Sequence, residues 1–526
     1  STFPFPEEDA VKKFIHRHQD RITGILSGFD RLLFRGTLRQ IVYVGGMMRF
    51  LWTRQVLLKD FGAFAASVTE RVRTASCQAA LAQNRPVAYL PSLHTNKEAV
   101  ALKIAQRDGI TQGLICILRC VESCQSFIIF RNRDTRKLEL RPCRRKGLAL
   151  YHYLFDSWFG FMYARLETWF PFNVQIGING REWLARQLDR KGIAYQRHDN
   201  SFPWIADPDR AQTLLDGFLK TAWPRHLDAF ARRLNPAHAD IFRHFPASYY
   251  WSVPQSEWAT DVMFHDTASL AKIYPGLVHH AMTTCSSPDV MRFLGRKVHA
   301  GYQGEIVSDF KHRPEGVRVK HRAGKNSVKL YDKGGRILRA ETTLHHPQDF
   351  KVYRRKEGDP HGELAWRPLR KGVADLHRRA EISQAANERY LDALASADTS
   401  TPVGQLLRPL CRPVTWHGER VRGLRPCAAD DLALFQAIAR GEFAINGFRN
   451  RDLQKLLFPT PPPDPAQQRR RSGRVTRLLR LLRAHGLIRK VPSSHRYQLT
   501  DKGRETTATV ITTQLVTLQQ LTRAAA

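Results

Sequence analysis

The first 200 residues alternate between helical and strand patterns of apolar positions. Apolar residues three or four positions apart predict helices, whereas short apolar runs and strict alternation predict strands. Because the two patterns follow one another repeatedly, we expect a mixed α/β or α+β body. The predicted helices cover 7–27, the stretch up to 82, 96–109 and 180–191, and the predicted strands cover 30–36, 113–121, 127–140, 148–179 and 193–196.

The pattern continues past residue 200 with helices and a block of strands. Helices are predicted at 208–243, 266–284, 287–294 and 372–397, strands at 249–264 and 298–355, and a loop at 357–374. Weak periodicity and several prolines in 398–428 indicate a domain boundary. We expect an N-terminal α/β region 1–205, a helical segment with a basic antiparallel sheet 206–371, a helical spacer and linker 372–428, a compact unit 429–504 and a helical tail 505–526.

Residues 429–504 show the order helix, strand, helix, helix, hairpin. The helices are predicted at 430–440, 451–458 and 472–484, the short strand at 443–445 and the hairpin at 487–499. The runs Leu478–Lys490 and Tyr497–Gly503 resemble the winged helix-turn-helix domains of MarR-like bacterial regulators. This resemblance implies a DNA-binding domain, which here carries a proline-rich insert at 459–471.

The exposed side of the third predicted helix is basic. Side chains there can reach phosphates and base edges in a major groove, and a wing residue can reach the backbone or the minor groove. The predicted nucleic-acid contacts are Arg474, Thr476, Arg477, Arg480 and Arg483 on the helix and Arg496 on the wing. A solvated basic face on a winged helix that binds other proteins is the alternative.

Residues 316–344 alternate strictly between apolar and polar positions. The segments 316–322, 327–333 and 337–344, with a tight turn at Gly334-Gly335, predict a three-stranded antiparallel meander. One face is expected to enter a core with Val317, Val319, Val328, Leu330, Leu338 and Ala340. The opposite face is expected to display Arg318, Lys320, Arg322, Lys329, Tyr331, Arg339 and Glu341.

A phenol and a carboxylate on that basic face form a candidate catalytic pair. Tyr331 is the candidate nucleophile for attack on a DNA phosphate, because nearby cations lower the pKa of a phenol and attract a phosphodiester. Glu341 is the candidate ligand of Mg²⁺ or Mn²⁺, which would polarise a phosphoryl oxygen. Glu305, Asp309 and Asp261 are the further candidate metal ligands. The candidate phosphate clamps are Arg318, Lys320, Arg322, Lys329 and Arg339.

The segments Ser327–Lys333 and Leu338–Thr343 resemble a strand pair in the rolling-circle replication initiators of plasmids and filamentous phages. Those proteins nick DNA through a tyrosine beside a metal, so the resemblance implies nicking by Tyr331. The chain lacks the His-hydrophobe-His metal motif of that family, because its paired histidines are direct neighbours. Two alternatives stay open: a binding sheet in which Tyr331 stacks on a base and Glu341 forms a salt bridge, and a purely structural sheet.

A cysteine cluster and one aspartate are weaker candidates. The cysteines are Cys116, Cys120, Cys124 and Cys143, whose spacings differ from common zinc knuckles, so we expect buried thiols. Asp30 at the head of a strand, with Glu98 and Asp156, resembles the carboxylates of RNase-H-type nucleases. The plainer interpretation is a charged residue at a strand end.

The composition of the chain favours nucleic acid as the partner of these motifs. Lys and Arg number 83 against 48 Asp and Glu, a formal charge of +35 that predicts a polyanionic partner. The N-terminal residues lack a secretory pattern, no segment is apolar enough for a membrane helix, and the eight cysteines are too sparse for a disulfide scaffold, so we expect a cytoplasmic protein. No phosphate-cradling or dinucleotide motif occurs, so we expect no nucleotide cofactor.

The favoured hypothesis is a site-specific DNA nicking, strand-transfer or replication-initiator protein of a mobile element or plasmid. In it, the winged helix selects the site and Tyr331 acts with a divalent metal. The alternatives are a non-enzymatic DNA-binding regulator or accessory protein, and a structured-RNA-binding ribonucleoprotein component. No feature of the sequence indicates an oligomeric state.

Overall fold

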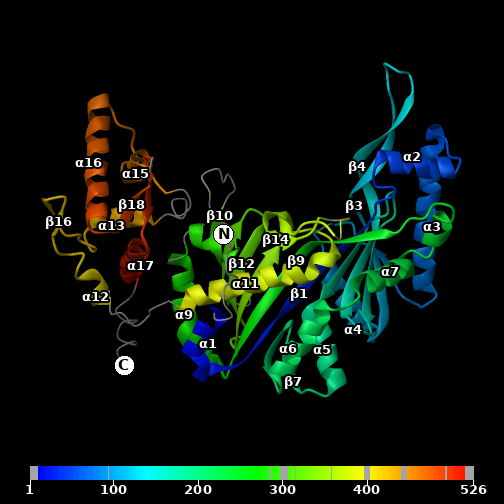
Figure 1. Ribbon diagram of the computed structural model, residues 1–526, viewed down its shortest axis with the longest axis horizontal. Helices are drawn as coiled ribbons and strands as arrows, with labels where there is room; N and C mark the ends of the chain where they lie inside the picture. Colours follow the sequence, from blue (N-terminus) through cyan, green and yellow to red (C-terminus); the bar gives the residue numbers. More distant parts are fainter. Residues whose placement is uncertain are drawn as a thin grey trace. The chain divides into compact units, whose positions relative to one another are not determined.

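The structure is a computed structural model that describes residues 10–515 except 93, 284, 286, 296–305, 314–315, 357, 360, 396–402, 440–446 and 492–493. The chain divides into two compact units, and Figure 1 labels their elements. Unit 1 comprises Ser1–Arg21, Asp266–Arg336 and Glu388–Ala526, and unit 2 comprises Ile22–His265 and Ile337–Asn387. Helices and strands are intermixed along the chain, which confirms the expected mixed body.

Unit 2 is built on a mixed sheet with the strand order β13-β9-β1-β6-β5-β4-β3-β2. The neighbouring strands are antiparallel except β2 and β3, which are parallel. The strands of this sheet are β1 Ile22–Leu38, β2 Val87–Tyr89, β3 Gly113–Arg131, β4 Leu138–Asp156, β5 Gly160–Glu167, β6 Val174–Asn179, β9 Tyr249–Phe264 and β13 Ile337–Leu344. Two short pairs accompany it, β7 Tyr195–His198 with β8 Ser201–Ile205 and β14 Lys351–Arg354 with β15 Ala365–Pro368.

The helices of unit 2 bury a large apolar core against the sheet. They are α2 Val44–Thr53, α3 Phe61–Leu81, α4 Lys97–Arg107, α5 Gly180–Lys191, α6 Pro208–Leu219, α7 Trp223–Leu234 and α8 His238–Ile241. α5 starts directly over β1, since a Cβ atom at Gly180 would lie 1.9 Å from the carbonyl oxygen of Phe29. Only glycine permits this close approach, which brings the next residue of α5 down onto the sheet.

The other face of β9 and β13 is covered by α11, Leu376–Ala395, whose first part belongs to unit 2. Asn387 donates to the carbonyl oxygens of Trp258 and Ala340 and accepts a hydrogen bond from Thr342. Arg379 is fully buried and donates to the carbonyl oxygen of Val253. α11 therefore covers this face, and every residue of β13 is buried.

Unit 1 holds a smaller strand group and several helices. Its N-terminal and central elements are α1 Ala10–His18, α9 Thr267–Thr283, α10 Ser287–Phe293, β10 Ile306–Arg313, β11 Gly316–Ala323 and β12 Asn326–Lys333. β11 pairs antiparallel with both β10 and β12. The predicted strand boundaries at 316 and 333 are confirmed, and Val319, Val328 and Leu330 are fully buried as expected.

The C-terminal part of unit 1 has its own apolar core. Its elements are α12 Val403–Leu407, β16 Val414–Trp416, β17 Glu419–Val421, α13 Ala429–Ile438, α15 Asn450–Leu457, α16 Pro465–Ala484, β18 Ile488–Lys490, β19 Tyr497–Leu499 and α17 Asp501–Leu515. Leu434, Leu453, Val475 and Leu482 are fully buried in that core. The predicted strand at 443–445 lies outside the described residues.

Several boundary predictions are wrong. The predicted helix 7–27 ends at His18, and β1 begins at Ile22, because the β-branched residues Ile22, Thr23 and Ile25 favour extension of the strand that carries Asp30. The predicted strand pair at 249–264 is one continuous strand. α16 begins at Pro465 rather than 472, because Asp464 caps it by accepting a hydrogen bond from the backbone of Gln467 and proline is tolerated at the first helical position.

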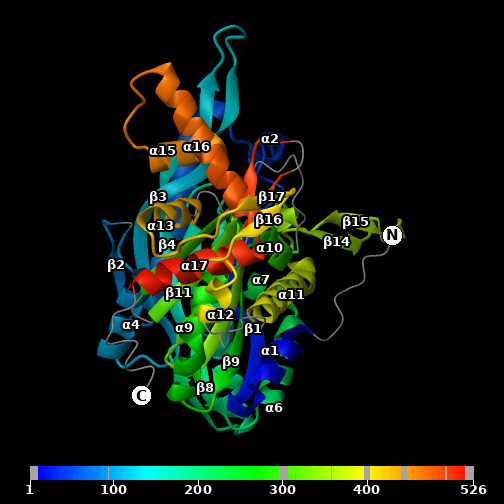
Figure 2. The same cartoon turned by 90° about the vertical axis from the view of Figure 1, so that its left-hand side faces the viewer.

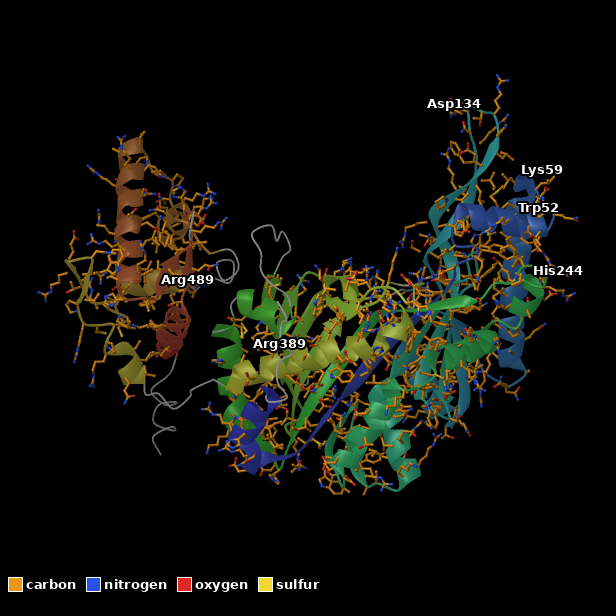
Figure 3. All side chains as sticks on the ribbon, viewed as in Figure 1. Trp52, Lys59, Asp134, His244, Arg389 and Arg489 are labelled. Carbon is orange, nitrogen blue, oxygen red and sulfur yellow. The ribbon has the colours of Figure 1, made fainter. Side chains whose placement is uncertain are left out.

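The hairpin of β3 and β4 carries Asp134 at its tip, and Trp52 extends from α2, as Figure 3 shows. The Trp52 side chain is 83% exposed. In the part of the chain that the structure describes, no helix combines the length and apolar character needed to cross a bilayer.

Candidate functional site

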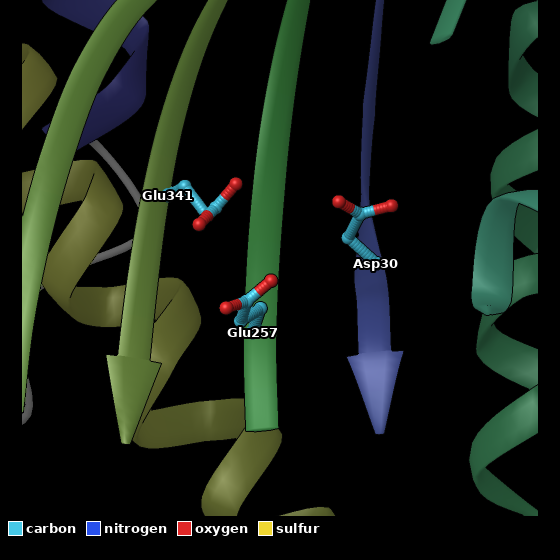
Figure 4. Close-up of side chains that lie close together, drawn as sticks. All are labelled: Asp30, Glu257 and Glu341. Atoms are coloured by element: carbon cyan, nitrogen blue, oxygen red, sulfur yellow. The ribbon is translucent and has the colours of Figure 1, made fainter. Parts of the chain in front are cut away.

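Three carboxylates from three neighbouring strands converge on one face of the unit 2 sheet. Asp30 lies on β1, Glu257 on β9 and Glu341 on β13, and Figure 4 shows Glu257 on the strand between the other two. Their ligand oxygens all lie within 4.8 Å of one another. We call these three residues the carboxylate cluster.

The strand register explains why the carboxylates meet. Glu341 pairs with Ala259, so Glu257, two residues along β9, lies on the same face and diagonally adjacent. On β1, Phe29 pairs with Trp258 and Arg31 pairs with Glu257, which leaves Asp30 as an inserted residue. This β-bulge turns the Asp30 side chain toward the face that carries the other two carboxylates.

The cluster sits mainly in the interior, next to a buried network of arginines. Asp30 and Glu341 are 4% and 3% exposed, whereas Glu257 is half-buried. Arg339 donates to Asp261 from Nε at 2.5 Å and from Nη2 at 2.9 Å, and to Asp30 Oδ2 from Nη1 at 3.1 Å.

Arg181 at the start of α5 contributes the second cation of this network. Its Nη2 lies 3.0 Å from Asp261 and donates to the carbonyl oxygen of Ala259. Asn200, from the turn between β7 and β8, donates to both oxygens of Asp30 at 2.7 and 2.9 Å. These contacts hold Asp30 rigidly at the edge of the cluster. We call Arg181 and Arg339 the arginine pair.

Carboxylates and guanidiniums are gathered closely at this site. The carboxylate cluster and Asp261 supply four carboxylates, and the arginine pair supplies two buried guanidiniums. Burial raises the pKa of Asp30 above its ordinary value of 3.8, the arginine pair opposes that rise, and Glu341 and Asp261 add to it. The exposed Arg31, opposite Glu257 in the register, is a further cation at the solvent side. Oxygen ligands with surplus negative charge are what a hard divalent cation requires.

Comparison with known protein families, curated proteins and solved structures found no match to this chain.

Two predicted site residues occupy positions different from those expected. Arg339 was expected on an open face as a phosphate clamp, but it is fully buried and engaged with Asp30 and Asp261. Asp261 was expected as a metal ligand, but both of its oxygens accept from arginines. Asp309 lies on β10 in unit 1, opposite Lys320, and Glu305 lies outside the described residues.

Tyr331 and Glu341 belong to different units, because the boundary falls between β12 and β13. Tyr331 is half-buried and pairs with Arg318 across β11 and β12. Lys320 pairs with Lys329, and burial together with Lys329 lowers the pKa of Lys320. The cations Arg318, Lys320, Arg322 and Lys329 occupy the face of this strand pair opposite its buried valines, as the alternation predicts.

The predicted contact residues of α16 differ in their surroundings. Arg474 and Arg477 are exposed, and Thr476 accepts a hydrogen bond from Asn450. Arg480 and Arg483 instead lie against Trp416 of β16, with guanidinium carbons 5.8 and 5.0 Å from the ring centre. Arg480 is also ion-paired with Glu419. Arg496 is half-buried beside β19.

The weaker candidate residues lie in different surroundings. Cys116, Cys120 and Cys124 are buried thiols, and burial raises the pKa of Cys116 to about 12, so its thiol stays protonated. Asp156 accepts from the backbone of Trp158 and Phe159 in a turn. Of the predicted RNase-H-type set, only Asp30 belongs to the carboxylate cluster, since Glu98 lies on α4 and Asp156 at the end of β4.

Glu257 is the member of the cluster that the sequence prediction missed. It belongs to the alternating series Glu257, Ala259 and Asp261, so period-two alternation along one strand would have placed it on the same face as the candidate ligand Asp261. The obstacle was the expected break within 249–264, because a turn there would have placed the two acids on different strands.

The raised pKa of Asp30 predicts a pH effect on stability without metal. Because the folded pKa lies above 3.8, this group favours the folded state fully below that pH. Its contribution is lost as the pH rises through the folded pKa. Thermal unfolding in EDTA across acidic and neutral pH measures this loss, and Asp30→Asn is expected to remove that part of the pH dependence. An unchanged pH profile in Asp30→Asn would show that Asp30 titrates normally.

Proposed function

We propose that this protein is a metal-dependent enzyme that cleaves DNA strands, with the carboxylate cluster as its metal site. The observation that carries this proposal is the convergence of Asp30, Glu257 and Glu341 within 4.8 Å from three neighbouring strands. Mutually close carboxylates in a largely buried site repel one another unless a cation compensates them. Bound Mg²⁺ or Mn²⁺ would polarise a phosphoryl oxygen and stabilise charge during phosphodiester cleavage.

Three features favour DNA as the substrate. The formal charge of +35 favours a polyanion. The cations on β11 and β12 share one face. The sequence of the C-terminal segment resembles MarR-like winged helix-turn-helix domains, and in such a domain α16 would serve as the recognition helix and the β18–β19 hairpin as the wing.

The central test is cleavage of labelled single-stranded and supercoiled DNA in EDTA, Mg²⁺ or Mn²⁺. Cut products that form only with a divalent metal are expected. Tight binding that falls steeply with salt while the DNA stays uncut would instead support a non-enzymatic regulator. Purification with a defined cellular RNA and no effect on DNA would support the ribonucleoprotein alternative.

The narrower proposal of strand transfer assigns the nucleophile to Tyr331. Its phenolic oxygen would lose its proton and form a bond to phosphorus while the bond from phosphorus to the leaving deoxyribose oxygen breaks, and that oxygen takes up a proton. The wild-type protein is then expected to form an SDS-stable adduct with labelled DNA, and Tyr331→Phe is expected to lose it. Cleavage that persists in Tyr331→Phe without any adduct in the wild type would make water the nucleophile.

Removing Arg477 is expected to weaken DNA binding through a lost phosphate contact. Arg477 is exposed on α16. The slope of log K against log salt concentration should fall by about 1 in Arg477→Ala. Fluorescence anisotropy at several salt concentrations measures it, and Arg107→Ala, on α4 of unit 2, is the matched control. Equal slopes for the two variants would contradict a role for α16 in contacting DNA.

A further inference from the structure

Unit 2 contains a strongly basic pocket of about 330 Å³, and none of the residues that line it belongs to the carboxylate cluster. It lies where the β14–β15 pair, which Figure 2 shows as neighbouring ribbons, approaches the start of α11. The lining residues are Arg354, Arg355, Lys356, Gly358, Asp359, Leu364, Arg370 and Arg378. Cations thus dominate the lining, and Asp359 is its one carboxylate.

A buried carboxylate behind the pocket organises its arginines. The side chain of Asp375 has no solvent exposure. Arg370 donates to both of its oxygens, at 2.8 and 2.9 Å, and Arg378 Nη1 donates to its Oδ1 at 2.7 Å. Arg354 Nε lies 4.0 Å away. One carboxylate therefore anchors Arg370 and Arg378 and lies close to Arg354.

The backbone holds the deepest of these guanidiniums in place. Arg354 is 9% exposed. It donates to the carbonyl oxygen of Pro368 from Nε and Nη2, and to that of Arg355 from Nη1. Carbonyl acceptors orient a guanidinium without neutralising it, so the pocket keeps its surplus charge. Arg355 and Lys356 add exposed cations at the rim.

We propose that this pocket binds the terminal phosphate of a nucleic-acid strand. A terminal phosphate carries nearly two negative charges at neutral pH, against one for an internal phosphodiester, so surplus fixed guanidiniums favour the end of a strand. The volume is at the lower limit of small-ligand sites, which suits one terminal group rather than a duplex. The proposal rests on the proposed function only in taking nucleic acid as the source of the phosphate.

Binding without cleavage tests the proposal. Fluorescence anisotropy in EDTA compares labelled single-stranded DNA of one sequence with 5′-phosphate, 3′-phosphate or hydroxyl ends. At least one phosphorylated end is expected to bind about tenfold tighter than the hydroxyl end. Arg378→Gln and Arg355→Gln are each expected to reduce this preference severalfold, whereas Lys351→Gln, an exposed residue of β14 outside the lining, should retain it.

The possible outcomes separate the inference from the proposed function. A preference for phosphorylated ends in a protein that cuts no DNA would support the pocket and contradict the nuclease. Equal affinity for all ends, or a preference that Arg355→Gln and Arg378→Gln leave intact, would overturn the pocket whether or not DNA is cut. Arg355→Gln removes an exposed side chain, and Arg370 still pairs with Asp375 in Arg378→Gln, so both variants are expected to fold.

Discussion

The Glu341→Gln protein is expected to cleave DNA at least about a hundredfold more slowly than the wild type in Mg²⁺. The amide keeps the shape of the side chain but removes the charge that the metal site needs. Its unfolding free energy without metal is expected not to fall, because one of three mutually repelling carboxylates is gone. Rates of nicking and urea unfolding curves measured on the same preparations give both quantities.

A matched acidic residue far from the cluster controls this result. Glu70 on α3 is 63% exposed, so Glu70→Gln should cleave at the wild-type rate. Glu257→Gln should resemble Glu341→Gln, since both residues belong to the cluster. If Glu341→Gln cleaved DNA at the wild-type rate, this result would contradict the assignment of the cluster as the metal site. If Glu341→Gln lost stability together with activity, this result would indicate a structural role for Glu341.

Replacing Arg339 with methionine is expected to lower the unfolding free energy by roughly 3–5 kcal/mol. The substitution leaves two buried carboxylates, Asp30 and Asp261, without the guanidinium that bridges them. Arg181 still contacts Asp261, which limits the loss to one of the two cations. Urea unfolding followed by circular dichroism measures the change, with each transition of the two-unit chain fitted separately.

An exposed arginine of the same unit provides the comparison. Arg210 lies exposed on α6, and Arg210→Met is expected to change the unfolding free energy by less than about 0.5 kcal/mol. If Arg339→Met were as stable as Arg210→Met, the buried network would contribute nothing to the fold. The double variant Arg339→Met/Asp261→Asn should recover part of the loss, because it removes a carboxylate that the first change left unpaired.

Local patterns predicted the strand pair β11–β12 well. Alternation placed Val319, Val328 and Leu330 in the interior and the cations on the other face. The same alternation failed for Arg339, because a period of two assigns a residue to a face and does not say what covers that face. A strand covered on both sides buries its polar residues too, provided that they find charged partners.

The candidate site was only partly predictable for a related reason. Asp30, Glu257 and Glu341 are distant in sequence and meet only because β1, β9 and β13 are neighbours in the sheet. No short motif encodes that pairing. Asp30 and Glu341 were each singled out, but with different partners, and the bulge that turns Asp30 toward the cluster has no signature in the sequence around it.

Distant contacts also changed the prediction for α16. The helix is basic, as its sequence indicates. However, Arg483 lies against Trp416 of β16, and Arg480 is ion-paired with Glu419 of β17. The short hairpin of β16 and β17 falls in a segment that was expected to be a linker. Arg474 is exposed but ion-paired with Asp430, whereas Arg477 is exposed on the same helix, so Arg477 is the predicted DNA contact that we single out on α16.

The most direct test of the account is the position of a metal ion in a crystal of the full chain soaked in Mn²⁺. Anomalous scattering is expected to show a peak between the carboxylates of Asp30, Glu257 and Glu341, and the peak should vanish in a crystal of Glu341→Gln. A wild-type map with no peak at the cluster, at a Mn²⁺ concentration that supports DNA cleavage, would contradict the assignment of the carboxylate cluster as the metal site.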